Sequence, residues 1–191
     1  MPQQEEKKPV NPDPQIQEKL LKTRSILLSG EINKDSAEAV IKQMLILEDE
    51  SNEPIKIFIN SPGGDVDAGY AIFDMARFIN AEVTMIGMGL VASAAALVLL
   101  AVPKQRRLAL PNSTYLIHQP MSGMRGVATD IEIHAQHLEK LRQKLDALIA
   151  QETGKTLEEV REDTERDHWL SAEEALNYGL VDRIVTQRSD L

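Results

Sequence analysis

The sequence contains no cysteine. Disulfide bonds, a cysteine nucleophile and a cysteine zinc site are therefore excluded, and nothing indicates an oxidising compartment. An excess of basic charge is also absent, because 21 Lys and Arg residues stand against 30 Asp and Glu residues, for a formal net charge of -9. This balance argues against nucleic acid as the main partner. The rest of the composition is that of an ordinary soluble globular protein, and 191 residues suit one domain with a sizeable core.

The first residues, MPQQEEKKPVNPDPQ, are polar, charged and rich in proline. They lack the apolar stretch of a secretory signal and the basic, acid-poor character of a transit peptide. We therefore expect a disordered or flexible tail over residues 1–18 on a cytoplasmic protein, followed by a single domain over residues 19–191.

The longest apolar run covers residues 83–102, carries no charge and contains Ser93. Its length permits a membrane span, and a basic cluster at 104–107 follows it as a topology signal would. However, Gly87 and Gly89 interrupt the run, and its second part is rich in Ala and Leu, which are good helix formers. A short buried strand over 83–86, a glycine turn and a helix that begins near Ser93 explain the run better than one span.

A serine at the first turn of a helix has a chemical meaning. Unpaired N–H groups and the positive end of the helix dipole favour developing negative charge there, so the N–H of Ala94 is a natural oxyanion donor. The arrangement resembles a nucleophile elbow, although Val91 and Ala95 replace the glycines of the G-x-S-x-G signature. The alternative for Ser93 is a buried serine that bonds a carbonyl one turn back.

Apolar spacing predicts alternating strands and helices over the rest of the chain, which is typical of an α/β protein with a largely parallel sheet. We expect strands over 25–29, 55–60, 115–118 and 181–185; helices over 16–23, 66–80 and 128–152; a helix begun by the N-cap pair Asp35 and Glu38; helices begun by the capping boxes Thr156–Glu159 and Ser171–Glu174; and a helix end at Gly179.

The strand over 55–60 runs into the turn Ser-Pro-Gly-Gly-Asp, residues 61–65. Two glycines between a strand and a helix let the backbone approach a ligand and direct N–H groups at an oxyanion or phosphate. The turn matches neither G-x-G-x-x-G nor a P-loop, and an ordinary turn is the alternative.

The histidines are less informative taken singly. His118 lies on an apolar strand, where a satisfied core histidine is the alternative to a functional one. His134 and His137 are three residues apart on the long helix, but no HExxH or third ligand accompanies them, so we predict no metal site. Nothing in the residues around Asp167 indicates a function for it.

The nonpolar seam of the long helix indicates subunit contact. It comprises Ile131, Leu138, Leu141, Leu145 and Leu148.

Five segments together are far more specific than any one of them: INSPGGDVDAG, GLVASAAA, LALPNSTYLIHQP, GVATDIEIHA and DTERDHWLSAEEALNYGLVD. In this order and spacing, the chain from about Ser25 to Val185 resembles the Clp proteolytic subunits, the ClpP peptidase family. The resemblance implies an α/β fold of repeated ββα units, as in the crotonase superfamily, with a protruding handle helix over 128–152. It also implies the hydrolysis of peptide bonds in unfolded polypeptides.

Residue by residue, the resemblance implies a serine peptidase site. Ser93 matches the nucleophile, His118 in IHQP the general base, and Asp167 the acid that orients the histidine. Gly64 and Ala94 match the two backbone donors of the oxyanion hole.

The resemblance also implies partners. The segment Ser122, Gly123, Met124, Arg125 and Gly126 matches a strand that pairs with the substrate backbone. Arg166 falls where the family couples ring contact to triad alignment. The expected assembly is a tetradecamer of two stacked heptameric rings, fed by an AAA+ unfoldase of the Clp-X or Clp-A type. No cofactor is implied for this chain, since ATP is used only by the unfoldase, and neither nucleic acid nor membrane is an expected partner.

Two departures from the family pattern bear on assembly. Ala94-Ala95 replaces the usual Met-Gly after the nucleophile, and the usual N-terminal axial segment is absent or replaced by the polar tail. The chain is thus a candidate for a divergent subunit that assembles with a second ClpP paralogue. Two alternatives follow: a non-catalytic ring subunit, recognised by activity only after a paralogue is added, and a crotonase-like acyl-CoA enzyme, recognised by acyl-CoA binding.

Overall fold

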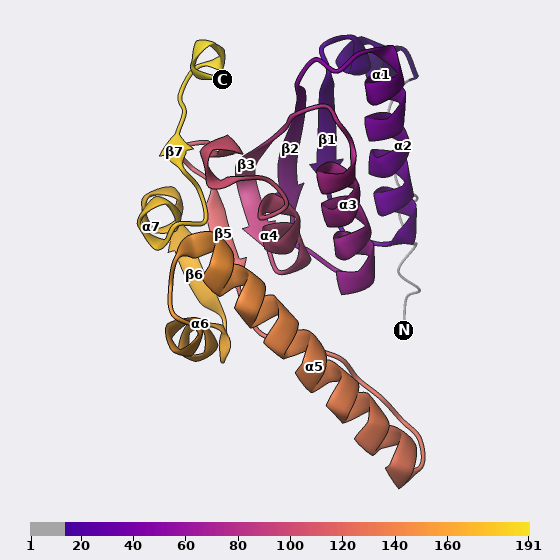
Figure 1. The fold of residues 1–191 in the computed structure, drawn as a ribbon, viewed down its shortest axis with the longest axis vertical. Helices are drawn as coiled ribbons and strands as arrows, with labels where there is room; N and C mark the ends of the chain where they lie inside the picture. Colours follow the sequence, from indigo (N-terminus) through magenta and orange to yellow (C-terminus); the bar gives the residue numbers. More distant parts are fainter. Residues whose placement is uncertain (1–13) are drawn as a thin grey trace, which may run out of the picture.

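A seven-stranded sheet runs through the computed structural model, which describes residues 14–191 (Figure 1). Most of the expected tail lies outside the described residues, but residues 14–18, which we assigned to it, belong to the first helix. The elements are α1 (Pro14–Lys22), β1 (Ser25–Ser29), α2 (Lys34–Glu50), β2 (Ile55–Ser61), α3 (Val66–Phe78), β3 (Val83–Ala92), α4 (Ala94–Leu99), η1 (Lys104–Arg106), β4 (Arg107–Ala109), β5 (Thr114–Ile117), α5 (Ala128–Thr153), α6 (Leu157–Thr164), β6 (His168–Ser171), α7 (Ala172–Tyr178), β7 (Arg183–Ile184) and η2 (Arg188–Asp190).

The strand order β1-β2-β3-β4-β7 is parallel throughout, as the alternating pattern predicted. β5 pairs in parallel with the second half of β3, and β6 pairs antiparallel with β5. Parallel strands are covered on both faces, which explains runs such as Ile55, Ile57 and Ile59, all without exposure to solvent. Together with the helices, this sheet confirms the α/β class.

The expected glycine turn after residue 86 is wrong, because β3 continues through both glycines to Ala92. At Gly87 the ring of Tyr115 occupies the place of a side chain, and Gly89 has a φ of +57°. Beside Gly89, the side-chain oxygen of Asn60 accepts from the N–H of Leu90 at 3.1 Å. The glycines therefore form an irregularity within the strand, where β3 changes its partner from β4 to β5.

Helix caps follow the sequence closely, with one correction. The capping boxes at Thr156 and Ser171 and the left-handed helix end at Gly179 are confirmed. The N-cap of α2, however, is Asn33, whose side chain accepts from the N–H of Ser36, and not the expected pair of Asp35 and Glu38. Asparagine is as good an N-cap as aspartate, so the helix begins two residues earlier.

The apolar run over 83–102 is divided between β3 and the buried helix α4, and it contributes many of the residues of the main core. Within residues 14–191, no helix combines the length and the nonpolar character that crossing a membrane requires.

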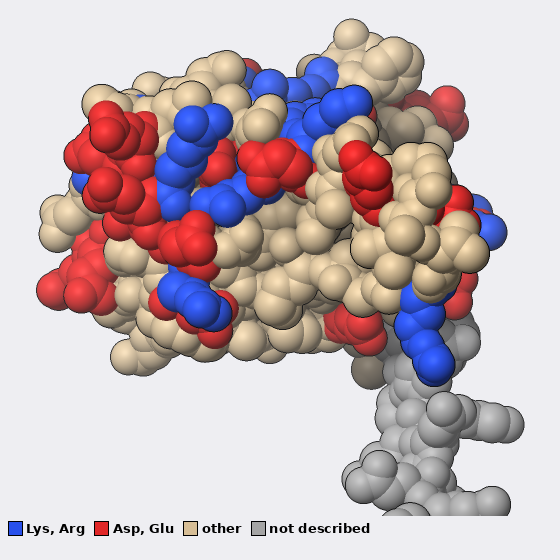
Figure 2. Space-filling view, turned by 90° about the horizontal axis from the view of Figure 1, so that it is seen from below, with Lys and Arg blue, Asp and Glu red and all other residues tan. Residues whose placement is uncertain are grey.

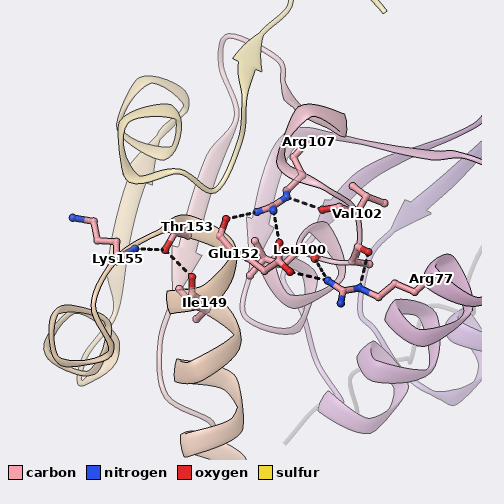
Figure 3. A network of polar contacts seen from close by, with 9 residues as sticks. Arg77, Leu100, Val102, Arg107, Ile149, Glu152, Thr153 and Lys155 are labelled. Carbon is pink, nitrogen blue, oxygen red and sulfur yellow. Dashed lines mark hydrogen bonds and ion pairs between the residues drawn. The ribbon is translucent and has the colours of Figure 1, made fainter.

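The long helix α5 extends away from the sheet, and only its C-terminal end packs on the body of the molecule (Figure 1). A polar network fixes this end (Figure 3). The side chain of Arg107, 1% exposed, pairs with the carboxylate of Glu152 and donates to the carbonyl of Val102 at 2.9 Å. Arg77 binds the same carboxylate at 2.8 Å and the carbonyls of Leu100 and Ala101. The network thus joins α5 to α3, β4 and the segment that follows α4.

Candidate active site

Ser93 lies at the junction of β3 and α4, where its backbone adopts φ +55° and ψ -121°. A positive φ in a residue other than glycine is strained by about 1–3 kcal/mol and persists only where the surroundings hold it. Here the Ser93 N–H donates to the carbonyl of Leu116 at 2.9 Å, and the Ser93 carbonyl accepts from Ala96 at 2.9 Å. The prediction that a helix begins near Ser93 is confirmed, with Ser93 at the N-cap rather than within the first turn, and its backbone strain is typical of a nucleophile elbow.

The double-glycine turn contacts this junction directly. Gly63 has a φ of +86°, and a Cβ on it would lie 2.8 Å from the Ser93 Cβ and 2.5 Å from the carbonyl oxygen of Ala92. Gly64 has a φ of +144° and forms an isolated parallel bridge with Ile32. Gly63 therefore lets the turn approach the serine, a role that the sequence analysis did not assign to it.

Two backbone N–H groups at this contact are candidate hydrogen-bond donors to an oxyanion. Neither the N–H of Gly64 nor that of Ala94 donates a hydrogen bond to another backbone group in the part of the chain that the structure describes. The bridge to Ile32 uses the carbonyl of Gly63 and the N–H of Asp65, and Ala94 occupies the first position of its helix, where no intrahelical partner exists. Gly64 follows the glycine that contacts Ser93, and Ala94 follows Ser93 itself, while an oxyanion hole made of these two N–H groups stays a prediction.

His118 and Asp167 come together through the pairing of β5 with β6. The antiparallel register ends with Ile117 opposite His168, so the next two residues, His118 and Asp167, are cross-strand neighbours just beyond the ladder. His118 Nδ1 lies 3.0 Å from Asp167 Oδ1. Since a carboxylate can only accept, the N–H of the neutral imidazole is at Nδ1, and Nε2 remains free to accept a proton.

His118 and Ser93 line the same pocket. The side chain of His118 is 12% exposed, whereas that of Asp167 is 60% exposed. Among residues 14–191, the hydroxyl of Ser93 forms no hydrogen bond, to His118 or to any other group, so the structure brings His118 to Asp167 and to the pocket of Ser93 but does not join the serine to the histidine. The remaining lining is mostly apolar; it includes Val66, Leu97, Leu100, Ile117, Leu145 and Leu148.

The predicted substrate-binding segment, Ser122 to Gly126, is exposed and extended but pairs with no strand within residues 14–191. A groove beside it is lined by residues 118–122, Leu138 and residues 165–167, so it contains Arg166 and both members of the His–Asp pair. Arg166 itself is exposed. Substrate binding by the segment and ring contact by Arg166 both stay predictions.

The two helix histidines do not meet. His134 Nε2 lies 2.9 Å from the hydroxyl of Ser122, and His137 is exposed. No group of three or more metal-ligating side chains gathers anywhere in residues 14–191.

Comparison with known proteins shows the family to which the chain belongs. The model of the Clp protease family matches residues 11–188. The ATP-dependent Clp protease proteolytic subunit 2 of Treponema pallidum is 61% identical over 175 residues, which cover 91% of this chain and 88% of that protein. The proteolytic subunit 3 of Rhizobium etli is 51% identical over 172 residues, covering 90% and 89%. The structure of a ClpP1 mutant from Listeria monocytogenes matches with a TM-score of 0.85 and 46% identity, covering 91% of this chain and 98% of that chain. The resemblance seen in the sequence is thereby confirmed: the chain belongs to the Clp protease family and is a peptidase.

Proposed function

We propose that the chain is a serine endopeptidase whose nucleophile is Ser93, activated by His118 and Asp167. The observation that carries the proposal is the 3.0 Å contact between His118 and Asp167 at the pocket that also contains the strained Ser93. A lone core serine or core histidine would need neither this partner nor this backbone conformation. A crotonase-like acyl-CoA enzyme would need none of the three side chains.

The reaction uses these groups in turn. His118 Nε2 takes the proton of the Ser93 hydroxyl as its oxygen bonds to the peptide carbonyl carbon, and the carbonyl oxygen becomes an oxyanion. The N–H groups of Gly64 and Ala94 bind this oxyanion. His118 then returns the proton to the leaving amine as the C–N bond breaks, and Asp167 stabilises the imidazolium meanwhile. Water releases the acyl group by the same steps, so the chain itself needs no cofactor.

The shape of the site favours unfolded polypeptides as substrates. The backbone groups of residues 122–126 can pair with an extended peptide, a mode that depends little on sequence. The mostly apolar pocket beside Ser93 accepts a nonpolar side chain next to the bond that is cut.

We further propose that the subunit works in a double-ring tetradecamer built through α5. Large nonpolar side chains of α5 and of the segment before it are exposed. The view from below shows acidic side chains gathered at one end of the molecule and, beside them, a broad area without charged residues (Figure 2). Such a surface is typical of a protein–protein contact. The exposed side chains are Met121 (80%), Val127 (66%), Ile131 (44%) and Ile133 (61%). Leu145 and Leu148 of the predicted seam instead pack against the core of their own chain.

Two stacked rings would enclose the active sites, so folded substrates need a partner that unfolds them and passes them into the rings. We propose an AAA+ unfoldase of the Clp-X or Clp-A type in this role, with ATP used only by that partner. A second ClpP paralogue in the ring is part of the same proposal, in view of the altered N-terminal segment. Dependence on an ATP-using partner favours a cytoplasmic location, where the nucleotide is available.

The test is hydrolysis of a fluorogenic peptide with a nonpolar residue before the scissile bond, by the purified full chain and by Ser93→Ala. Native mass spectrometry of both proteins controls for assembly. We expect turnover by the unchanged chain, alone or with its paralogue, and none above background by the assembled Ser93→Ala protein. Equal turnover by both proteins, or hydrolysis of acyl-CoA in place of the peptide, would contradict the proposal.

A further inference from the structure

The base and the acid of the proposed triad are held from two sides. On one side, the β5–β6 ladder ends just before His118 and just after Asp167. On the other side, Gln119 clamps the end of α6: its N–H donates to the carbonyl of Thr164, and its side-chain amide donates to the carbonyl of Glu165, each at 2.7 Å. The His118–Asp167 contact therefore lies between a sheet ladder and a clamp of two hydrogen bonds.

The clamp is anchored to α5 through a buried carboxyl group. The inner end of α5 lies beside α6 (Figure 1). Asp146, in the C-terminal part of α5, is 2% exposed, and Thr164, the last residue of α6, is 1% exposed. The Thr164 hydroxyl lies 2.8 Å from Asp146 Oδ1 and 2.9 Å from the carbonyl oxygen of Val160. A hydroxyl has one proton, and both neighbours can only accept when Asp146 is ionised. The Thr164 hydroxyl therefore shares its proton between Asp146 and the carbonyl of Val160, a three-centre arrangement that is common at helix ends.

The charge of Asp146 is poorly compensated. Its Oδ2 atom is buried without a hydrogen-bond partner and forms only a long ion pair, 3.8 Å, with Arg142 Nε. Burial raises the pKa of Asp146 and outweighs the opposing effects of Thr164, Arg142 and Arg161. Glu139 on the same helix raises it further, and Tyr178 of α7 adds no positive charge. An unpartnered neutral carbonyl oxygen costs far less than an unpartnered buried anion.

We propose that Gln119, Thr164 and Asp146 are positioning residues, which hold His118 and Asp167 at hydrogen-bond distance and connect them to the protruding helix α5. Asp146 accepts the hydrogen bond of the Thr164 hydroxyl and so anchors the end of α6 to α5. Arg142 of α5 also binds the carboxylate of Glu165 at 2.6 Å, so the same helix contacts the segment before Asp167 twice. The inference rests on the proposed function, since these residues matter for the reaction only if His118 and Asp167 act on Ser93.

The direct test replaces Gln119 by Met, which keeps the shape of the side chain and removes its amide donor. Gln143→Met is the matched control, because Gln143 is exposed on α5 and its amide donates to Glu139. We expect Gln119→Met to lower kcat and the rate of fluorophosphonate labelling roughly fivefold, the rate equivalent of one hydrogen bond, with KM unchanged and the thermal midpoint lowered by no more than about 2–4 °C. Gln143→Met should change none of these.

A second pair of variants tests the anchor. Asp146→Asn keeps an acceptor oxygen for the Thr164 hydroxyl and should keep kcat within about twofold of the unchanged protein, whereas Asp146→Leu removes the acceptor and should lose roughly fivefold. Native mass spectrometry verifies that both variants assemble as the unchanged protein does.

Two results would overturn the inference while leaving the proposed function intact. One is labelling of Gln119→Met at the rate of the unchanged protein; the other is equal kcat for Asp146→Asn and Asp146→Leu. A loss confined to KM would also overturn it, since a positioning role acts on the chemical step. Failure to label the unchanged protein at all would overturn the proposed function, and this inference with it.

Discussion

Replacing Glu152 by Ala removes the carboxylate that pairs with Arg107 and Arg77 at the inner end of α5 (Figure 3). The side chain of Arg107 is 1% exposed, so the variant leaves a buried guanidinium without its anion. Removing one partner of a buried pair costs about 3–5 kcal/mol, and we take the lower end because two backbone carbonyls still bind Arg107. The Arg77 side chain is 42% exposed, and its contribution is therefore small.

The assay is thermal unfolding at one fixed protein concentration, because assembly shifts the midpoint. For a chain of this size, a loss of about 3 kcal/mol lowers the midpoint by roughly 6–12 °C. Glu38→Ala is the matched control: it removes an exposed partner of Lys42 from α2 and should leave the midpoint close to that of the unchanged protein.

A double variant separates the unpaired charge from lost packing. Arg107→Met with Glu152→Leu removes both charges, so it should be markedly more stable than Glu152→Ala alone. If the double variant unfolds at or below the midpoint of Glu152→Ala, or if Glu152→Ala matches the Glu38 control, the network does not stabilise the base of α5 as the structure indicates.

Three further predictions concern single positions. Gly63→Ala should abolish peptidase activity, measured by peptide hydrolysis, because its Cβ would collide with the Ser93 junction; retained activity would show that the turn can withdraw. Burial raises the pKa of Asp146, so the folded chain keeps a proton that the unfolded chain releases at lower pH. Asp146→Asn should therefore gain stability relative to the unchanged protein as the pH rises above about 4. Denaturant titrations at several pH values measure both free energies of unfolding, and a difference between them that does not change with pH would contradict this. Gly179→Ala should destabilise the protein more than Gly30→Ala does. Both glycines have a left-handed φ, which costs a side chain about 1–2 kcal/mol, but only at Gly179 would a Cβ collide with a backbone carbonyl of α5. Equal thermal midpoints for the two variants would refute the collision.

Local signals in the sequence predicted most of the helix ends, although at α2 two neighbouring capping candidates competed and Asn33, not Asp35, is the cap. The capping boxes at Thr156 and Ser171 and the end at Gly179 depend on residues within one helical turn, and the structure has them as predicted. The path of β3 was not predictable in this way. Gly87 and Gly89 are typical of a turn, but they are required by Tyr115 and Asn60, which lie on other strands.

The candidate site shows the same limit. The place of Ser93 before a helix followed from composition, whereas nothing near Asp167 indicated a function. Its contact with His118 depends on the register of β5 with β6, across 49 residues of sequence. Only the resemblance to a family suggested the pair beforehand. The approach of Gly63 to Ser93 likewise depends on tertiary structure.

Intact-mass detection of a fluorophosphonate adduct on the full chain, beside Ser93→Ala and Asp167→Asn, tests the central claim most directly. If His118 and Asp167 activate Ser93, the unchanged protein gains one adduct, Ser93→Ala gains none, and Asp167→Asn reacts far more slowly because the imidazole loses its orienting carboxylate. An unchanged protein that gains no adduct, or an adduct that persists in Ser93→Ala, would contradict the claim that this serine is the nucleophile.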